Sequence, residues 1–343
     1  MNRLRRQIVF GLPALISGGA SIVQAQAQKS ENNPLAVDPA KPIAAGATRD
    51  LVLFNDATRR RIPVRIRMPR DIRKTGLIVY SPGLGSGIGN GASWCEAWRN
   101  AGFVVATLAH PGTDDQIWNT GSRSLRVNLS NALAASQYAL RVSDCRFVIQ
   151  QCLETLGIEA FIDAAAIGIA GHSFGAFTVE TMAAQAKAGR AAPQIGAAIA
   201  LSPGGRATNA AGRVSGIRIP YFCVTGDRDN HVTFGSGADA MKLGVPLPNR
   251  LAVYESLPKG AKQLLVLARA DHMTFAGETV SSRQFSRDVP HSDRDNAAAW
   301  SRVNHATTEF WLHYLKGGGS EPREQYLARI RTGLDPADRL EAG

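Results

Sequence analysis

The stretch AAIGIAGHSFG, residues 165–175, decides the fold, because it predicts a buried strand that turns sharply into a helix. Its first part, 165–170, is continuously apolar, as in strands of a sheet that is covered on both faces. Gly171, Ser173 and Gly175 then match the pattern G-x-S-x-G, in which small flanking residues permit a tight strand-to-helix turn. The turn lifts the serine hydroxyl above the sheet, where a helix N-terminus favours negative charge. We therefore predict that Ser173 is a nucleophile rather than an ordinary serine in a turn.

Apolar runs that alternate with segments of helical pattern lie on both sides of this motif. Such alternation predicts a mostly parallel sheet with helices on both faces. Two strands near the beginning, joined by a polar turn, predict an antiparallel pair that feeds this sheet. These features are typical of the α/β-hydrolase fold. The expected strands are 51–54, 62–67, 77–80, 103–108, 165–170, 195–201, 221–225 and 264–267, and the expected helices are 92–101, 125–156, one that begins at 174, and 297–315.

A serine hydroxyl is a weak nucleophile until a base removes its proton, and the chain has seven histidines. In this fold the acid and then the base follow the serine along the chain. His110 precedes Ser173, and we expect His172, inside the turn motif, to be structural. Among the later histidines, His272 alone comes directly after an apolar strand, residues 264–267. The carboxyl end of that strand lies at the same sheet edge as Ser173, so we predict His272 as the base.

The acid is expected in the loop after the strand 221–225, which reads GDRDN. Asp229 lies three residues past the glycine and has room to reach the imidazole, so we predict Asp229 as the acid. Asp227 remains the alternative. The preceding strand is followed by Ser202-Pro203, which offers no carboxylate.

Acyl transfer also needs hydrogen-bond donors for the oxyanion that develops on the substrate. The backbone N–H of Phe174, directly after the nucleophile, is one candidate. The loop 81–86, SPGLGS, follows a strand, and its glycines allow the amide of Leu84 to turn inward as the second donor. The alternatives are a plain turn or a phosphate-binding loop, but the G-K-[ST] ending of a nucleotide-binding loop is missing.

Three runs carry a family resemblance: SPGLGS at 81–86, GFVVA at 102–106 with HPG at 110–112, and the GHSFG motif. They resemble the predicted dienelactone hydrolase group, which is related to platelet-activating-factor acetylhydrolases and bacterial polyester hydrolases. The likeness covers about residues 50–315. Dienelactone hydrolases proper have a cysteine nucleophile where this chain has Ser173, which argues against lactone specificity. The acetylhydrolases carry the acid at the position of Ser202, whereas the polyester hydrolases place it as at Asp229.

The resemblance implies an enzyme that cleaves a small or polymeric carboxylic ester through an acyl-enzyme intermediate, with no cofactor. Trp94 and Trp118 lie in or near the expected loops of the active site, and we expect them to line an apolar pocket, with helix-on-sheet packing as the alternative. Other acyl-transfer enzymes, including thioesterases, peptidases, lipases and polyester hydrolases, remain alternatives. An inactive binding protein on the same fold is a third hypothesis.

The N-terminus has the pattern of a bacterial secretory signal peptide, residues 1–27. Three arginines precede a short apolar run, 8–23, and QAQA follows at 24–27. An ordinary first helix is the alternative, and Sec and twin-arginine export both remain open. This pattern predicts a periplasmic or secreted protein. The expected remainder is an arm or linker (28–48), one catalytic domain (49–316) and a C-terminal tail (317–343).

The formal net charge of +11 falls to +8 without the three arginines of the signal. Because the arginines are scattered, we expect a solvated basic surface rather than a nucleic-acid site. No apolar run of about 18 residues occurs after the signal, so no membrane-spanning helix is expected in the mature chain. No C-x-x-C or histidine-rich spacing suggests a metal site. The sequence leaves the oligomeric state open. It also leaves open any disulfide among the four cysteines, which are Cys95, Cys145, Cys152 and Cys223. Cys145 and Cys152 are expected on one helix, too far apart to form a direct bond.

Overall fold

The structure, a computed structural model, describes most of the chain beyond the predicted signal. Two compact units are distinguished, Met1–Val37 and Asp38–Gly343, and all described residues belong to the second. The predicted signal peptide and most of the predicted arm lie outside the described residues. The described ranges are 43–71, 73–119, 124–186, 194–204, 209–234, 241–260, 262–277, 293–317 and 319–343.

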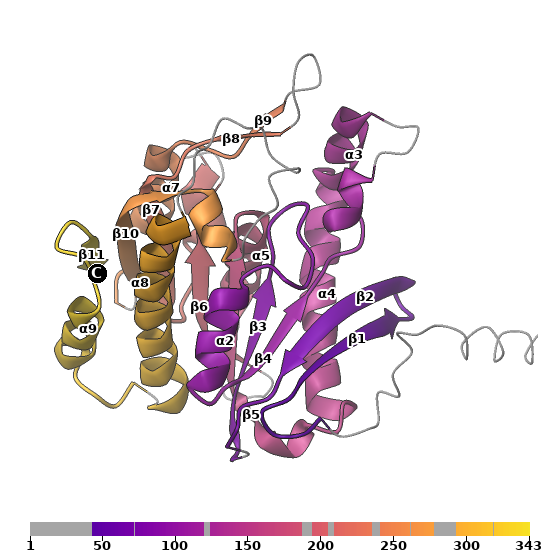
Figure 1. The fold of residues 1–343 in the computed structure, drawn as a ribbon, viewed down its shortest axis with the longest axis horizontal. Helices are drawn as coiled ribbons and strands as arrows, with labels where there is room; N and C mark the ends of the chain where they lie inside the picture. The colour runs from indigo at the N-terminus through magenta and orange to yellow at the C-terminus, as the bar shows by residue number, and fades with distance from the viewer. Residues whose placement is uncertain are drawn as a thin grey trace, which may run out of the picture. The chain divides into compact units, whose positions relative to one another are not determined.

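The described unit is built on a nine-stranded sheet of order β1-β2-β4-β3-β5-β6-β7-β10-β11 (Figure 1). The six strands from β4 to β10 in this order run parallel, and β1, β2 and β11 run antiparallel to their neighbours. This is the mostly parallel sheet that the sequence predicts. The strands are β1 Thr48–Asn55, β2 Arg60–Arg67, β3 Thr75–Ser81, β4 Val104–Leu108, β5 Ile162–His172, β6 Ile195–Leu201, β7 Tyr221–Arg228, β10 Lys262–Asp271 and β11 Arg339–Ala342.

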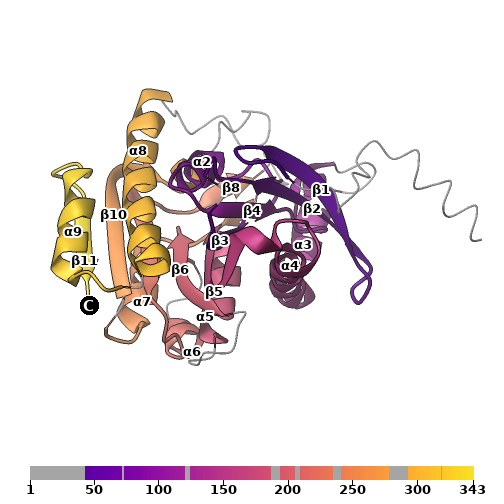
Figure 2. The same ribbon diagram turned by 90° about the horizontal axis from the view of Figure 1, so that it is seen from below.

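Helices cover both faces of the sheet, which explains why its central strands are apolar without interruption. Figure 2 shows α2 and α8 on one side of the sheet and α4, α5 and α6 on the other. Successive residues of β3 alternate between the two layers: Leu77 and Val79 pack with α4 and α5, whereas Ile78 and Tyr80 pack with α2 and α8. The helices are α2 Ala92–Asn100, α4 Ala135–Glu154, α5 Phe174–Ala184, α6 Ala210–Val214, α7 Leu247–Ser256, α8 Asp293–Trp311 and α9 Arg323–Thr332.

Three features near the carboxyl ends of the strands differ from the expected elements. The expected helix 125–156 is two helices, α3 (Leu125–Ala132) and α4, because Ala134 has extended backbone angles of φ −61° and ψ 146°. A short hairpin of β8 (Val232–Phe234) and β9 (Met241–Leu243) follows β7. One-turn helices η1 (Asp115–Trp118) and η5 (Met273–Ala276) follow β4 and β10.

The C-terminal segment, residues 317–343, packs on the rest of the described unit. β11 pairs antiparallel with β10 and supplies the ninth strand. On α9, Tyr326 and Ile330 are fully buried, and the Tyr326 ring stacks on His313 at 4.3 Å between centroids. Asp338 accepts hydrogen bonds from Ala268 N at 2.8 Å and from an arginine of α8. The segment therefore stabilises β10, the strand that directly precedes His272.

All four cysteines are buried free thiols, so the structure contains no disulfide between any of them. Two of them, Cys145 and Cys152, lie on α4 as expected. Burial raises the pKa of both of these thiols to about 12, which makes them poor nucleophiles. Among the described residues, no helix is both long enough and apolar enough to cross a membrane.

Candidate active site

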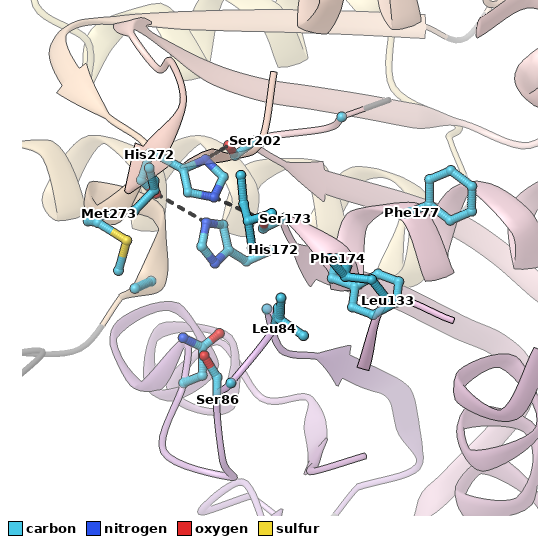
Figure 3. A pocket seen from close by; sticks show the side chains of 18 of the residues that line it. Leu84, Ser86, Leu133, His172, Ser173, Phe174, Phe177, Ser202, His272 and Met273 are labelled. Atoms are coloured by element: carbon cyan, nitrogen blue, oxygen red, sulfur yellow. Dashed lines mark hydrogen bonds between the residues drawn. The ribbon is translucent and has the colours of Figure 1, made fainter. Parts of the chain in front are cut away.

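Ser173 occupies a strained turn between β5 and α5. Its backbone angles are φ 54° and ψ −112°, which are unusual for a residue with a side chain. A Cβ on Gly175 would lie 1.9 Å from the carbonyl oxygen of Ser81, and one on Gly171 would lie 2.6 Å from the Gly175 backbone. The two glycines of the motif are therefore required by close backbone approach. Figure 3 shows the resulting position of Ser173, between His272 and Phe174 at the floor of a pocket.

The structure brings together the three side chains that the sequence singles out. His272 Nε2 lies 3.0 Å from Ser173 Oγ, and His272 Nδ1 lies 2.9 Å from Asp229 Oδ1. Asp229 is fully buried, whereas Asp227, the alternative acid, is exposed at the end of β7. An ionised carboxylate can only accept hydrogen bonds, so Nδ1 carries the proton and Nε2 has a lone pair that faces Ser173.

Asp229 is held ionised by a cation and by hydroxyl groups. Desolvation by burial acts to raise the pKa of Asp229, but Arg250 and hydrogen bonds from His272 and Ser202 outweigh it, so the pKa lies below its usual value. Arg250 Nε lies 2.9 Å from Asp229 Oδ1. Ser202 and Thr225 donate to Oδ2 at 2.6 and 2.8 Å. The carboxylate can therefore orient the imidazole throughout the neutral range of pH.

Sequence reasoning missed the role of Arg250 and gave Ser202 none. Arg250 comes from α7, is 1% exposed, and also donates to the carbonyl oxygens of Ser202 and Pro203 at 2.9 and 3.0 Å. Ser202 has a positive φ of 56°, and its Oγ lies 2.8 Å from His272 Nδ1. The position of Ser202 after β6 was the available sequence signal. Nothing in the local pattern marks Arg250 as buried.

His172 lies against the predicted base instead of pointing away from it. Its Nε2 donates to the backbone oxygen of His272 at 3.1 Å, and the two rings are 4.9 Å apart between centroids. Burial and then the nearby His272 keep the pKa of His172 well below its usual value, so the imidazole is neutral. A neutral ring here packs beside the base without competing for the proton of the serine.

The two predicted oxyanion donors flank Ser173. Phe174 is the first residue of α5, and the first amides of a helix have no acceptor one turn earlier. Leu84 lies in the loop after β3, and both residues line the same pocket as Ser173. The next residue, Gly85, is held on both sides: its N–H donates to Thr113 O at 2.8 Å, and its carbonyl accepts from Trp118 Nε1 at 2.7 Å. The loop is therefore fixed directly beside Leu84.

The pocket above these groups has a volume of about 620 Å³. The side chains that line it are mostly apolar, and Figure 3 shows Met273 on one side of Ser173 and Phe177 on the other. Trp94 is fully buried and Trp118 packs against Gly85, and neither residue is among those that line the pocket. The aromatic wall is formed instead by residues of α4 and α5: Tyr138, Phe174 and Phe177.

A site for a metal ion is not evident in the part of the chain that the structure describes. There, no group of three or more histidine, cysteine or acidic side chains is arranged to hold an ion.

No protein-family model matches this sequence, and no curated protein sequence matches it either. Solved structures do share its fold. One is a dienelactone hydrolase from Anabaena variabilis ATCC 29413, with 16% identity and a TM-score of 0.51 over 78% of this chain and 99% of that chain. Another is 2,6-dihydroxy-pseudo-oxynicotine hydrolase, with 16% identity and a TM-score of 0.51 over 80% of this chain and 69% of that chain. Together with the sheet order, these similarities show that the chain has the α/β-hydrolase fold.

Proposed function

We propose that the protein is a serine hydrolase that cleaves carboxylic esters through an acyl-enzyme intermediate. The observation that carries this proposal is the continuous chain of hydrogen-bonding groups from Ser173 through His272 to the buried Asp229, at the floor of a pocket. Two hydrolases among the solved structures with this fold support the general class. The serine triad and the ester specificity are our own inference from the site.

In the acylation step, His272 Nε2 takes the proton of Ser173 as its Oγ bonds to the carbonyl carbon of the ester. The oxyanion that forms accepts hydrogen bonds from the amides of Leu84 and Phe174. The imidazolium, stabilised by Asp229, then gives its proton to the alcohol oxygen as the C–O bond breaks. In the second half of the reaction a water molecule gives a proton to Nε2 as its oxygen bonds to the acyl carbon. The imidazolium then returns that proton to Ser173 Oγ as the acyl C–Oγ bond breaks, which releases the acid and restores the serine.

The first experiment tests whether Ser173 is an activated nucleophile. We expect a fluorophosphonate probe to label the wild type and not Ser173→Ala, while both variants have the same circular dichroism spectrum. Ser136→Ala, which changes an exposed serine on α4, is the matched control and should label like the wild type. Equal labelling of Ser173→Ala and wild type, or no labelling of either, would overturn the proposal, and the second result would favour an inactive binding protein.

The second experiment separates esterases from other acyl-transfer enzymes that share these residues. We expect measurable turnover of p-nitrophenyl acetate or butyrate, slower turnover of the octanoate, and turnover of the matching p-nitroanilides that is at least about 100-fold lower. Comparable rates on anilides would indicate a peptidase. Preference for thioesters over oxygen esters of the same acid would indicate a thioesterase.

A further inference from the structure

A second polar network lies beneath the active site, centred on Arg141 of α4. Arg141 is fully buried, yet each of its three nitrogens has a partner. Nε donates to Thr178 Oγ1 at 3.1 Å, and Nη1 donates to Thr113 Oγ1 at 2.7 Å. Nη2 donates to Ser81 Oγ at 3.1 Å and to Pro82 O at 2.5 Å. One guanidinium therefore joins the end of β3, the loop after it, the loop after β4, and helix α5.

The charge of this arginine persists at neutral pH despite its burial. Desolvation lowers the pKa of Arg141, but only to about 10. A buried cation is expensive unless hydrogen bonds replace its lost water, and the four oxygens around Arg141 supply such bonds. Loss of any of these hydrogen bonds would leave part of a buried cation unsolvated, and this cost in free energy holds the four oxygens in place.

Ser81, His110 and Asp144 form a chain that resembles a catalytic triad but has no access to solvent. Ser81 Oγ lies 2.9 Å from His110 Nε2, and His110 Nδ1 lies 2.9 Å from Asp144 Oδ2, which also pairs with Arg60 at 2.8 Å. His110 and Asp144 are 0% exposed and Ser81 is 2% exposed. Burial and then Arg141 lower the pKa of His110 to about 3, so its imidazole is neutral. A buried chain of this kind orients groups and does not meet substrate.

Each hydrogen bond in the series from Arg141 through Ser81 and His110 to Asp144 has a defined donor and acceptor. Asp144 accepts the proton of His110 Nδ1, so His110 Nε2 is left to accept the Ser81 hydroxyl proton. The lone pairs of Ser81 Oγ are then free to accept from Arg141 Nη2. The network therefore fixes the end of β3 in one arrangement.

This network contacts the side chain of one proposed oxyanion donor, Phe174, and the neighbours in sequence of the other, Leu84. Pro82, whose carbonyl oxygen accepts a hydrogen bond from Arg141, lies two residues before Leu84. Gly85, which follows Leu84, donates its N–H to the carbonyl oxygen of Thr113. On the other side, the Arg141 guanidinium lies 4.4 Å from the centre of the Phe174 ring and bonds Thr178 one turn further along α5. Contacts of the single Arg141 side chain therefore link the two segments that carry the amides of Leu84 and Phe174.

We propose that Arg141 is a positioning residue of the oxyanion hole: it holds the amides of Leu84 and Phe174 at the spacing that a tetrahedral oxyanion requires. The proposal rests on the proposed serine-hydrolase function. Oxyanion donors act through preorganisation, and the loss of one donor lowers kcat by about 100-fold to 1,000-fold. A change at Arg141 displaces donors without removing them, so we expect kcat to fall by roughly 10-fold to 100-fold and KM to change less than threefold.

The decisive readout is the affinity for an inhibitor that forms an oxyanion. The carbonyl carbon of a trifluoromethyl ketone bonds to Ser173 Oγ, whose proton passes to His272 Nε2, and the ketone oxygen becomes an oxyanion. The matching methyl ketone binds mainly as the neutral ketone. In Arg141→Met, the inhibition constant of the trifluoromethyl ketone should rise at least about 10-fold, while that of the methyl ketone stays within about twofold. Partial unfolding would raise both inhibition constants by the same factor, so a selective loss of affinity for the trifluoromethyl ketone does not arise from destabilisation alone.

Arg67→Met is the matched control, because Arg67 is an equally buried arginine at 1% exposure that bonds Glu96 and Thr107 outside the pocket. It should lower the melting temperature and leave both inhibition constants unchanged. If Arg141→Met does not fold, Arg141→Lys keeps the charge with fewer directed donors and should show the same selective loss at smaller size. Wild-type affinity for the trifluoromethyl ketone in the folded variant would overturn the role of Arg141. A wild type that neither reacts with esters nor binds the trifluoromethyl ketone would overturn the serine-hydrolase function itself.

Discussion

At the scale of single residues, Asp229 and Asp227 are two positions apart, yet one carboxylate is buried beside His272 and the other is exposed. The backbone leaves β7 with Asp227 directed to solvent and turns Asp229 inward, where Arg250 and two hydroxyl groups surround it. Only the inward carboxylate contacts His272. The difference in burial, rather than the residue type, decides which of the two can orient the base.

We expect Asp229→Asn to lower kcat about 10³-fold to 10⁴-fold, because an amide no longer fixes the imidazole tautomer with its lone pair toward Ser173. Asp227→Asn should leave kcat within about twofold, since its side chain is exposed. Steady-state kinetics of both variants, normalised to folded protein, provide the measurement. A larger loss of activity in Asp227→Asn than in Asp229→Asn would show that the acid is misassigned.

The sequence predicted the three side chains of the candidate triad, and it predicted neither of the two buried arginines nearby. Ser173 and His272 each follow an apolar strand, so the parallel sheet places both at one edge. Arg141 and Arg250 lie in helices, where a charged residue is usually solvated. Only the packing of α4 and α7 against the sheet makes these two side chains buried and directs them to the site.

At the scale of elements, the contact between α5 and α6 buries the carboxylate of Glu180, a residue of α5. Glu180 is 1% exposed, its Oε2 pairs with Arg213 at 2.9 Å, and its Oε1 has no hydrogen-bond partner among the described residues. Desolvation raises the pKa of Glu180 to about 7, although Arg213 acts in the opposite direction. The folded state thus favours the protonated form more than the unfolded state does.

The pH dependence of stability follows from this shift. The contribution of Glu180 is fully present below about pH 4.5 and is lost as the pH rises through about 7, by an order of 3 kcal/mol for a shift of this size. Glu180→Gln has no titrating group here, so the free energy of unfolding of wild type relative to Glu180→Gln should fall between pH 4.5 and 8. Urea unfolding of both proteins at the two pH values measures this difference. A difference that is independent of pH would show that Glu180 titrates normally.

Which elements the sequence reveals depends on their length and burial. The central strands β3 to β6 are predicted well because every hydrophobic run there is covered on both faces. The hairpin of β8 and β9 has strands of only three residues each, which is too short for a pattern to emerge. The break between α3 and α4 is likewise invisible, because no proline or glycine marks Ala134.

At the scale of the described unit, the C-terminal segment adds β11 to the edge of the sheet. Its neighbour there is β10, the strand that His272 directly follows. β11 covers the edge of β10, and α9 packs Tyr326 and Ile330 into the layer that contains α8. Each fully buried side chain of this size contributes roughly 1.5–3 kcal/mol to stability. The last 27 residues are therefore expected to be structural in this chain.

Deletion of residues 317–343 should lower the melting temperature by at least about 5 °C, because it exposes the edge of β10 and the apolar surface under α9. Tyr326→Ala should give a smaller decrease of the same sign. Differential scanning calorimetry of the full chain and both variants is the measurement. A truncated protein that melts at the wild-type temperature would show that the segment adds nothing to the core.

The sequence by itself determined the α/β alternation and the tight turn at Ser173, because each of these depends on a local pattern of apolar and small residues. The order of serine, acid and base was inferred from the loops that follow three strands, and their catalytic roles stay a prediction. Only the tertiary structure decided that Asp229 rather than Asp227 meets His272, that Trp94 and Trp118 lie outside the pocket, that Arg250 pairs with Asp229, and that Arg141 is buried against the loop after β3. These outcomes depend on contacts between segments that are far apart along the chain. Such contacts are set by burial and packing, which leave no periodic pattern in the sequence.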